Sequence, residues 1–153
     1  MAASVVVEYR YDAFDNRMER LENNGTTTTE RFAYEGWDTA HPGAIDSENF
    51  DAFFDLSEGS EVTTRRIYGA GFDDLVARYD DSATGWYLTD YLGSDRGVLD
   101  DGGNVSGAAT YDGWGNVTSG TPVDRVQYTG RERDAATGLR HNGWRSRWPS
   151  TSC

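Results

Sequence analysis

The sequence has no lysine, so all 14 of its basic residues are arginines. This absence excludes a lysine Schiff base, a lysine general base and the lysine of a phosphate-binding loop. Cysteine occurs once, at Cys153, which excludes an intrachain disulfide and gives no information about the redox compartment. Long hydrophobic runs are missing too. The run from Val5 to Val7 is too short to predict a signal peptide or a membrane-spanning segment, so the localisation stays unknown.

Aliphatic residues are sparse, and aromatic residues supply much of the apolar surface. Only 37% of the 153 residues are hydrophobic, but there are 9 Tyr, 6 Phe and 5 Trp, together with 18 Gly. Tyr and Trp keep a polar group, which suits half-buried sheet faces better than a dry interior. The length allows one ordinary domain.

Acidic residues dominate the charge, with 26 Asp and Glu and a net charge of −12. Such a charge disfavours binding to nucleic acid and to anionic membrane surfaces, so neither is expected as a partner. The last acidic residue is Asp134, whereas residues 140–153 carry three arginines. We therefore expect an atypical basic tail over 140–153, without regular structure.

The hydrophobic pattern predicts short strands joined by tight turns. Apolar and aromatic residues occupy every second position of VVVEYRY (5–11), as expected for a half-buried strand. Further strands are predicted in 17–22, 26–35, 62–68, 75–80, 85–92, 96–100, 104–112 and 124–130. In LDDGGNV, Asp101 and Gly102 predict a primed hairpin turn, whose central residues have positive φ. The sequence therefore indicates an all-β antiparallel hairpin array.

Residues 36–60 are expected to form an irregular insertion, because Pro42-Gly43 is a strong turn signal. Two alternatives remain at the end of this segment. Residues 51–69 resemble a hairpin with a polar Ser-Glu-Gly-Ser tip. A short helix near 47–56 is the other alternative, because Ser47 is a suitable N-cap.

Three kinds of phrase stand in order along the chain. YRYDAFDNRM (9–18) and TYDGWGNV (110–117) each contain Tyr-Asp, with an Asn five residues after the Tyr. YLTDYLGSDRGVLDDGGNV covers 87–105, and YTGRERDAATGL covers 128–139. The first kind resembles the tyrosine-aspartate (YD) repeat, the second the signature hairpin of the Rhs repeat-associated core, and the third the phrase that follows in that core. The residues of the structural repeat motif are Tyr9, Tyr11, Asp12, Asn16, Tyr34, Trp37, Asp90, Leu92, Gly93, Ser94, Arg96, Tyr111, Asp112, Trp114, Asn116, Tyr128, Gly130, Arg131, Asp134 and Gly138.

This resemblance to the Rhs/YD-repeat family implies a large secreted or cell-surface β-shell in which hairpins enclose a cavity. Rhs proteins of bacteria and the teneurins of animals share such a shell. In many bacterial members it encloses a C-terminal toxin, which is released by self-cleavage at a pair of aspartates near the end of the core.

The chain departs from the family pattern at several positions. Tyr91 stands where His is usual, and Asp95 where Val is usual. After Leu139 the chain reads RHNGWRSRWPSTSC instead of a Tyr-rich continuation with the self-cleaving aspartates. We therefore expect residues 1–139 to be a C-terminally truncated fragment of the core, followed by a tail that arises from a frameshift or is otherwise foreign to the family.

Candidate chemical sites are weak by comparison. The pairs Asp73-Asp74, Asp80-Asp81 and Asp100-Asp101 are sequence neighbours, whose side chains point to opposite faces of a strand. Asp is also a preferred turn residue, so a structural role is expected for them. His41 and His141 have no neighbouring Cys or His, so a metal site is not expected, and neither is a cofactor.

The expected function is that of a non-catalytic structural fragment of a shell, which in the intact protein encapsulates or displays a C-terminal toxin or effector. Its partners would be the rest of the shell or its cargo, and open sheet edges would favour self-association. The alternative is a carbohydrate- or cell-surface-binding β module that uses Trp37, Trp86 or Trp114. We expect these aromatic residues to pack in the wall, because cross-strand aromatic pairs stabilise sheets.

Overall fold

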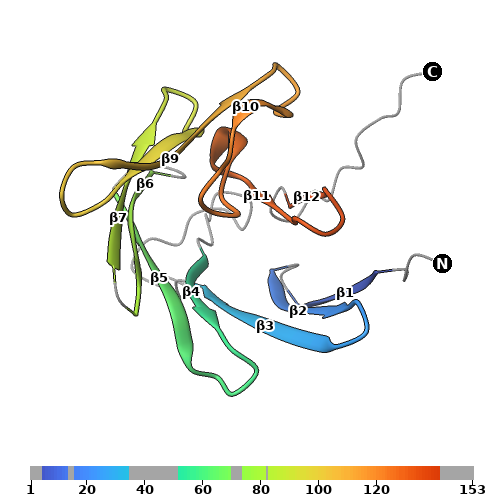
Figure 1. Ribbon diagram of the computed structural model, residues 1–153. Coiled ribbons are helices and arrows are strands. Elements are labelled where there is room, and N and C mark those ends of the chain that lie inside the picture. Colours follow the sequence, from blue (N-terminus) through green and yellow to red (C-terminus); the bar gives the residue numbers. More distant parts are fainter. Residues whose placement is uncertain (1–4, 14–15, 35–51, 70–73, 82, 142–153) are drawn as a thin grey trace, which may run out of the picture. The chain divides into compact units, whose positions relative to one another are not determined.

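A computed structural model describes residues 5–13, 16–34, 52–69, 74–81 and 83–141. Ten strands follow one another in one antiparallel sheet in sequence order, and a two-stranded sheet comes after them (Figure 1). The strands of the large sheet are β1 (Val6–Tyr11), β2 (Arg17–Asn23), β3 (Thr27–Tyr34), β4 (Ala52–Leu56), β5 (Val62–Tyr68), β6 (Leu75–Asp80), β7 (Ala83–Thr89), β8 (Asp95–Leu99), β9 (Val105–Tyr111) and β10 (Val117–Gly120). The short 3-10 turn η2 (Tyr128–Gly130) precedes β11 (Glu132–Arg133) and β12 (Arg140–His141). The predicted all-β hairpin array is confirmed.

The alternative of a short helix near 47–56 is wrong for its second half. Residues 52–56 form β4, which pairs with β3 on one side and β5 on the other. Two consecutive phenylalanines in AFFDL favour an extended strand, because aromatic residues pack well on a sheet. A register shift beside Phe53 brings the two rings into edge-to-face contact, with their centres 4.8 Å apart. Residues 47–51 lie outside the described residues.

The chain divides into two compact units, Met1–Arg66 and Ile67–Cys153. In the first unit the buried residues include arginines as well as apolar side chains. Phe32 and Ala52 are buried, and so are Arg17, Arg20 and Arg66. Because aliphatic residues are few, the arginine stems supply apolar surface while their guanidinium groups stay hydrogen-bonded or stacked.

Arg17 is the clearest case in the first unit. Its guanidinium carbon lies 4.7 Å from the ring centre of Phe32 and 5.6 Å from that of Tyr9. These rings come from β3 and β1, the two strands beside β2, so one cation holds three strands together.

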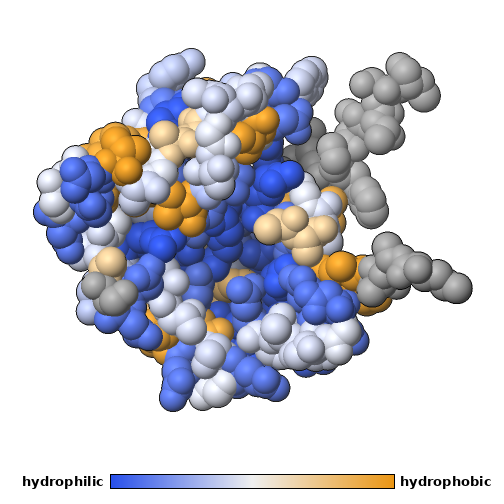
Figure 2. All heavy atoms as spheres, viewed as in Figure 1, coloured by the Kyte–Doolittle hydropathy of each residue, from blue (hydrophilic) through white to orange (hydrophobic). Residues whose placement is uncertain are grey.

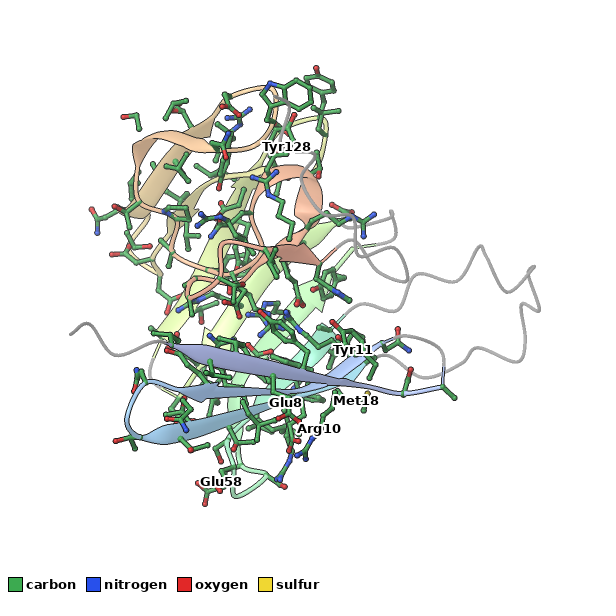
Figure 3. The ribbon with its side chains drawn as sticks, turned by 90° about the vertical axis from the view of Figure 1, so that its right-hand side faces the viewer. Glu8, Arg10, Tyr11, Met18, Glu58 and Tyr128 are labelled. Carbon is green, nitrogen blue, oxygen red and sulfur yellow. The ribbon has the colours of Figure 1, made fainter. Side chains whose placement is uncertain are left out.

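The other face of β1 and β2 carries partly exposed ion pairs. Arg10 contacts Glu8 on its own strand and donates to Glu19 of β2 at 2.7 Å, and Glu19 also accepts from Arg31 of β3 at 3.0 Å (Figure 3 labels Glu8 and Arg10). Exposed pairs of this kind contribute little to stability, and their main effect is on cross-strand register.

The second unit has a small apolar core. Leu75, Tyr87, Val98 and Val126 are buried together, and Tyr68 and Val123 pack against them. Hydrophobic side chains elsewhere appear as separate small patches among hydrophilic ones on the face shown in Figure 2. The described residues contain no helix long and apolar enough to cross a membrane.

Candidate functional site

Four hairpin turns share one hydrogen-bonding arrangement that begins at an aspartate. These turns span residues 12–16, 90–94, 100–104 and 112–116. In each, the backbone N–H of the Asp donates to the carbonyl of the fifth residue at 2.9–3.0 Å. The N–H of that fifth residue donates back to the Asp carboxylate at 2.8–3.0 Å. The Asp side chain therefore closes the same ring as the backbone does, which explains why Tyr-Asp is followed by Asn at a fixed distance.

A glycine in the left-handed conformation completes three of these turns. Gly93, Gly103 and Gly115 have φ of 75°, 78° and 81°, and each donates its N–H to the carbonyl of its turn's Asp at 2.9 Å. This is a three-residue hairpin loop in which a type I turn is followed by a left-handed residue. The predicted primed turn at Asp101-Gly102 is therefore wrong, because only Gly103 of this turn has positive φ.

Side-chain amides strengthen the turns where the fifth residue is Asn. The amide of Asn116 donates to Asp112 at 3.0 Å, and the amide of Asn16 donates to Asp12 at the same distance. These bonds to Asn116 lower the pKa of Asp112. At Asp100, the hydrogen bonds from Asn104 lower the pKa in the same way.

The turn at 90–94 uses an arginine where the others use an amide. Arg96 donates to Asp90 from Nε at 2.8 Å and forms an ion pair through a terminal nitrogen at 2.7 Å. Partial burial opposes ionisation of Asp90, but the hydrogen bonds from Ser94 and Arg96 outweigh it and lower its pKa. Ser94 and Arg96 of the signature phrase thus replace the Asn of the YD phrase.

The third phrase holds the turns of the other two together. The N–H of Thr129 donates to Oγ of the fully buried Ser94 at 3.0 Å, and the Tyr128 hydroxyl donates to the Gly113 carbonyl at 3.2 Å. Asp95 also donates its N–H to the Gln127 carbonyl at 3.2 Å. Segment 127–130 therefore bridges the turn that follows β7 and the turn that follows β9.

The remaining residues of the third phrase form their own turns. Gly130 has a φ of 68°, and the N–H of Gln127 donates to the Arg131 carbonyl at 2.9 Å. The Asp134 carboxylate accepts the N–H groups of Ala136 and Thr137 at 2.9 Å, and Gly138 has a φ of 72°.

The N-terminal tyrosines of the motif take different roles. Tyr9 stacks on Arg17, and the Tyr34 hydroxyl donates to the Arg17 carbonyl at 2.8 Å. Tyr11 is 45% exposed. Trp37 lies outside the described residues.

The two described tryptophans that were expected in the wall differ in exposure. Trp114 is 84% exposed at the tip of its turn, and Trp86 is 48% exposed on β7. Tyr91 and Leu92, at the tip of the signature turn, are 94% and 47% exposed. In this chain Trp114 does not pack in a wall, because its turn directs the middle side chains into solvent, whereas Trp86 is half buried on a strand and its wall packing stays a prediction.

Sequence reasoning missed two features that the structure brings out. The turn from Asp100 to Asn104 has the same arrangement as the YD turns, and its signal is the shared Asp-x-x-Gly-Asn spacing. The second is Asp95, which is 2% exposed and accepts the Gly97 N–H at 2.9 Å. Burial raises the pKa of Asp95 to about 6, the charge of Asp124 adds to this, and the Gly97 amide opposes it. No local pattern predicts this burial.

Three of the sequence-adjacent aspartates have structural contacts, and Asp73 lies outside the described residues. Asp80 pairs with Arg78 at 2.6 Å, Asp100 closes its turn, and Asp101 accepts from Trp86 Nε1 at 3.4 Å. Among the described residues, no group of three His, Cys, Asp or Glu side chains is arranged to hold a metal ion. His141 lies on β12, opposite Glu132.

Comparison with known proteins gives a fold but no family. No family model matches the chain, and no curated protein matches it. Solved structures do match it. The TcdB2-TccC3-Cdc42 crystal structure has a TM-score of 0.63 at 18% identity over 91% of this chain. TcdB2-TccC3 without its hypervariable C-terminal region has a TM-score of 0.62 at 18% identity over 91%. A Photorhabdus luminescens Tc holotoxin pore with a substituted TccC3 has a TM-score of 0.59 at 16% identity over 90%.

The chain shares a β fold with the matching parts of these Tc toxin structures. It spans only 7% of the length of each of these three matching chains. The matches therefore concern the arrangement of hairpins, and they bear on a small part of much longer proteins.

Proposed function

We propose that this chain is a non-catalytic structural portion of an Rhs/YD-repeat shell. In the intact protein it would contribute hairpins to a wall that encapsulates or displays a C-terminal toxin or effector. The observation that carries this proposal is the recurrence of one Asp-centred turn at residues 12–16, 90–94, 100–104 and 112–116. A turn repeated with the same hydrogen bonds is typical of a repeat architecture, in which each unit needs its neighbours to bury its faces.

The distribution of buried residues supports a wall more than an independent domain. Among the described residues, the core cluster of the second unit joins four buried side chains, and the buried residues of the first unit include three arginines. Such cores contribute little hydrophobic free energy for the number of residues they order. Additional hairpins would supply the missing burial.

The first strand offers an edge for such a hairpin. Within the described residues β1 pairs only with β2, and Val6 on β1 is 61% exposed. An unpaired strand edge is a template for another strand. We propose that it pairs with a neighbouring part of the shell, or with a second copy when the chain is alone.

The proposal is tested by the DNA that flanks the coding sequence and by the longer protein it encodes. We expect upstream in-frame repeats of Tyr-x-Tyr-Asp, and a cargo segment that resists protease in the longer protein but not when expressed alone. Flanking DNA without such repeats, together with a sharp cooperative melt of the purified chain as a monomer, would contradict the proposal.

A second candidate, a carbohydrate- or cell-surface-binding module, is favoured by the exposure of Trp114 and Tyr91. Flat exposed rings can stack on sugars, and both lie on rigid hydrogen-bonded turns. Screening the chain on a glycan array tests this function. Binding that is lost in Trp114→Ala but kept in Trp86→Ala would support it, and an array without any signal would remove it.

A further inference from the structure

Two arginines face each other across the small C-terminal sheet. Arg133 of β11 and Arg140 of β12 are directly opposite in the antiparallel register. Like charges in this position repel each other and destabilise a sheet. The repulsion is one reason that the pKa of Arg140 lies below its ordinary value, after desolvation by burial.

Neither arginine has a carboxylate partner among the described residues. Arg140 donates its terminal nitrogens to two backbone carbonyls, that of Trp114 at 2.5 Å and that of Gly115. Its Nε–H is buried and has no hydrogen-bond partner. The Arg133 side chain forms no hydrogen bond or ion pair within the described part of the chain. Most of the other described arginines pair with Asp or Glu, as Arg96 does with Asp90.

A tyrosine hydroxyl lies in the same electrostatic environment. The buried hydroxyl oxygen of Tyr111 has no hydrogen-bond partner. Its ring belongs to a stack of four groups, in which the Arg96 guanidinium lies 5.4 Å from Tyr111, Tyr111 lies 5.8 Å from Tyr128, and Tyr128 lies 5.3 Å from the Arg140 guanidinium. The stack fixes these rings and cations without satisfying the hydroxyl.

The nearby acids form no ion pair with Arg133 or Arg140 in the described part of the chain. Asp112 acts on Arg140 electrostatically, but its carboxylate is engaged by Asn116. Asp95 acts on Tyr111, and its carboxylate accepts the Gly97 N–H. A buried N–H donor, a buried hydroxyl and two arginines without a carboxylate partner therefore lie in one neighbourhood, linked by the β11–β12 register and by the Tyr111–Tyr128–Arg140 stack. Leaving such donors unsatisfied costs free energy, which a bound anion would recover.

We propose that Arg133, Arg140 and Tyr111 form a binding site for an oxyanion. Its ligand is a carboxylate or a phosphate-like group, held by the Arg140 Nε–H, the Tyr111 hydroxyl and the Arg133 guanidinium. This site is additional to the proposed shell function and does not depend on it. The ligand has two possible sources, a carboxylate side chain of another polypeptide segment or a free inorganic anion.

The binding test uses the whole 153-residue chain labelled with ¹⁵N. Sodium sulfate, sodium phosphate and a glutamate-rich peptide are titrated separately, with ionic strength held constant by sodium chloride. We expect a saturable shift of the Arg140 Nε–H resonance that chloride alone does not produce. Tighter binding of the peptide would identify a polypeptide carboxylate as the ligand, and tighter binding of phosphate or sulfate would identify a free anion.

Variants separate this site from a general effect of charge. Arg133→Gln should weaken anion binding at least tenfold, and Tyr111→Phe should weaken it by a smaller factor. Arg10→Gln makes the same charge change on an exposed strand of the first unit, and should leave binding unchanged.

The melting temperature gives a second readout with opposite signs. In chloride buffer, Arg133→Gln should raise the melting temperature, because it removes the repulsion with Arg140. Sulfate should raise the melting temperature of the parent chain above its value in chloride. Arg133→Gln should not show this increase. The proposal is overturned if the parent shows no saturable response, or if Arg133→Gln responds to sulfate as the parent does.

Discussion

The carboxylate of Asp112 accepts two hydrogen bonds from Asn116, one from the backbone N–H at 2.9 Å and one from the side-chain amide at 3.0 Å. Replacing Asp112 with Asn removes one acceptor oxygen and places a second NH2 group opposite the NH2 group of Asn116. We expect Asp112→Asn to lower the melting temperature by a few degrees, as measured by circular dichroism. Combining it with Asn116→Asp restores a complementary pair, and should recover part of the loss. Equal melting temperatures for the single and double variants would contradict this role of the pair.

The three turn aspartates with lowered pKa values also predict an acid response. Asp90, Asp100 and Asp112 ionise more readily in the folded chain than in the unfolded one. Their contribution to stability is present above the unfolded pKa near 3.8, and is lost as the pH falls through the lower folded values. Urea titrations between pH 5 and pH 2 should therefore show falling stability, with a weaker fall in Asp112→Asn.

Gly103 and Gly115 occupy the same turn position but differ in their surroundings. A β-carbon at Gly103 meets nothing within 4 Å, whereas one at Gly115 would collide with the Arg140 guanidinium. Gly103→Ala should therefore cost only the left-handed strain, about 1 kcal/mol. Gly115→Ala also displaces the end of the Arg140 side chain, and loses its hydrogen bonds to the Trp114 and Gly115 carbonyls, for a further cost of roughly 1 kcal/mol. Denaturant unfolding of the two variants measures the difference, and equal costs would mean that Arg140 does not hold its place against Gly115.

Asp95 predicts a pH dependence of opposite sign. Its pKa is raised from 3.8 to about 6 in the folded chain, so folding takes up a proton between these values. This contribution to stability is fully present below pH 3.8 and is lost as the pH rises through about 6, by at most about 3 kcal/mol. Asp95→Asn should therefore stabilise the chain at pH 7 and flatten the dependence between pH 4 and pH 7. Urea titrations at several pH values measure it, and a variant less stable than the parent at pH 7 would refute it.

Arg66 and Arg10 form a matched pair of arginines with very different burial. Arg66 is 1% exposed and donates to Asp55 at 2.8 Å, whereas the Arg10 side chain is 59% exposed. Arg66→Ala leaves a carboxylate that has lost its buried partner, and should lower the free energy of unfolding by about 3–5 kcal/mol. Arg10→Ala should change it by less than about 1 kcal/mol. Similar effects for both variants would show that burial does not decide the importance of these ion pairs.

Most strands of the large sheet and most turns could be predicted because their causes are local. The predicted strand over 124–130 is wrong, since Val126 makes only an isolated bridge and Tyr128–Gly130 form a 3-10 turn. Alternation along VVVEYRY and the Asp-to-Asn spacing act within a few residues, so they appear directly in the sequence. The turn at Asp101-Gly102 was assigned to the wrong type, since a Gly-Gly pair allows positive φ at either residue. The Gly103 N–H donates to the Asp100 carbonyl and the Gly102 N–H donates to the Asp100 carboxylate, and in this arrangement Gly103 is the residue with positive φ.

The sequence by itself determined the all-β class, the hairpin periodicity and the turn residues, because Asp, Asn and Gly select turn geometry through short-range hydrogen bonds. Only the tertiary structure decided which polar groups are buried. Thr129 reaches Ser94 across 35 positions, Arg17 lies between rings from two neighbouring strands, and Arg133 stands opposite Arg140. These relationships depend on strand register and on contacts between distant segments, which a local pattern of residues does not encode.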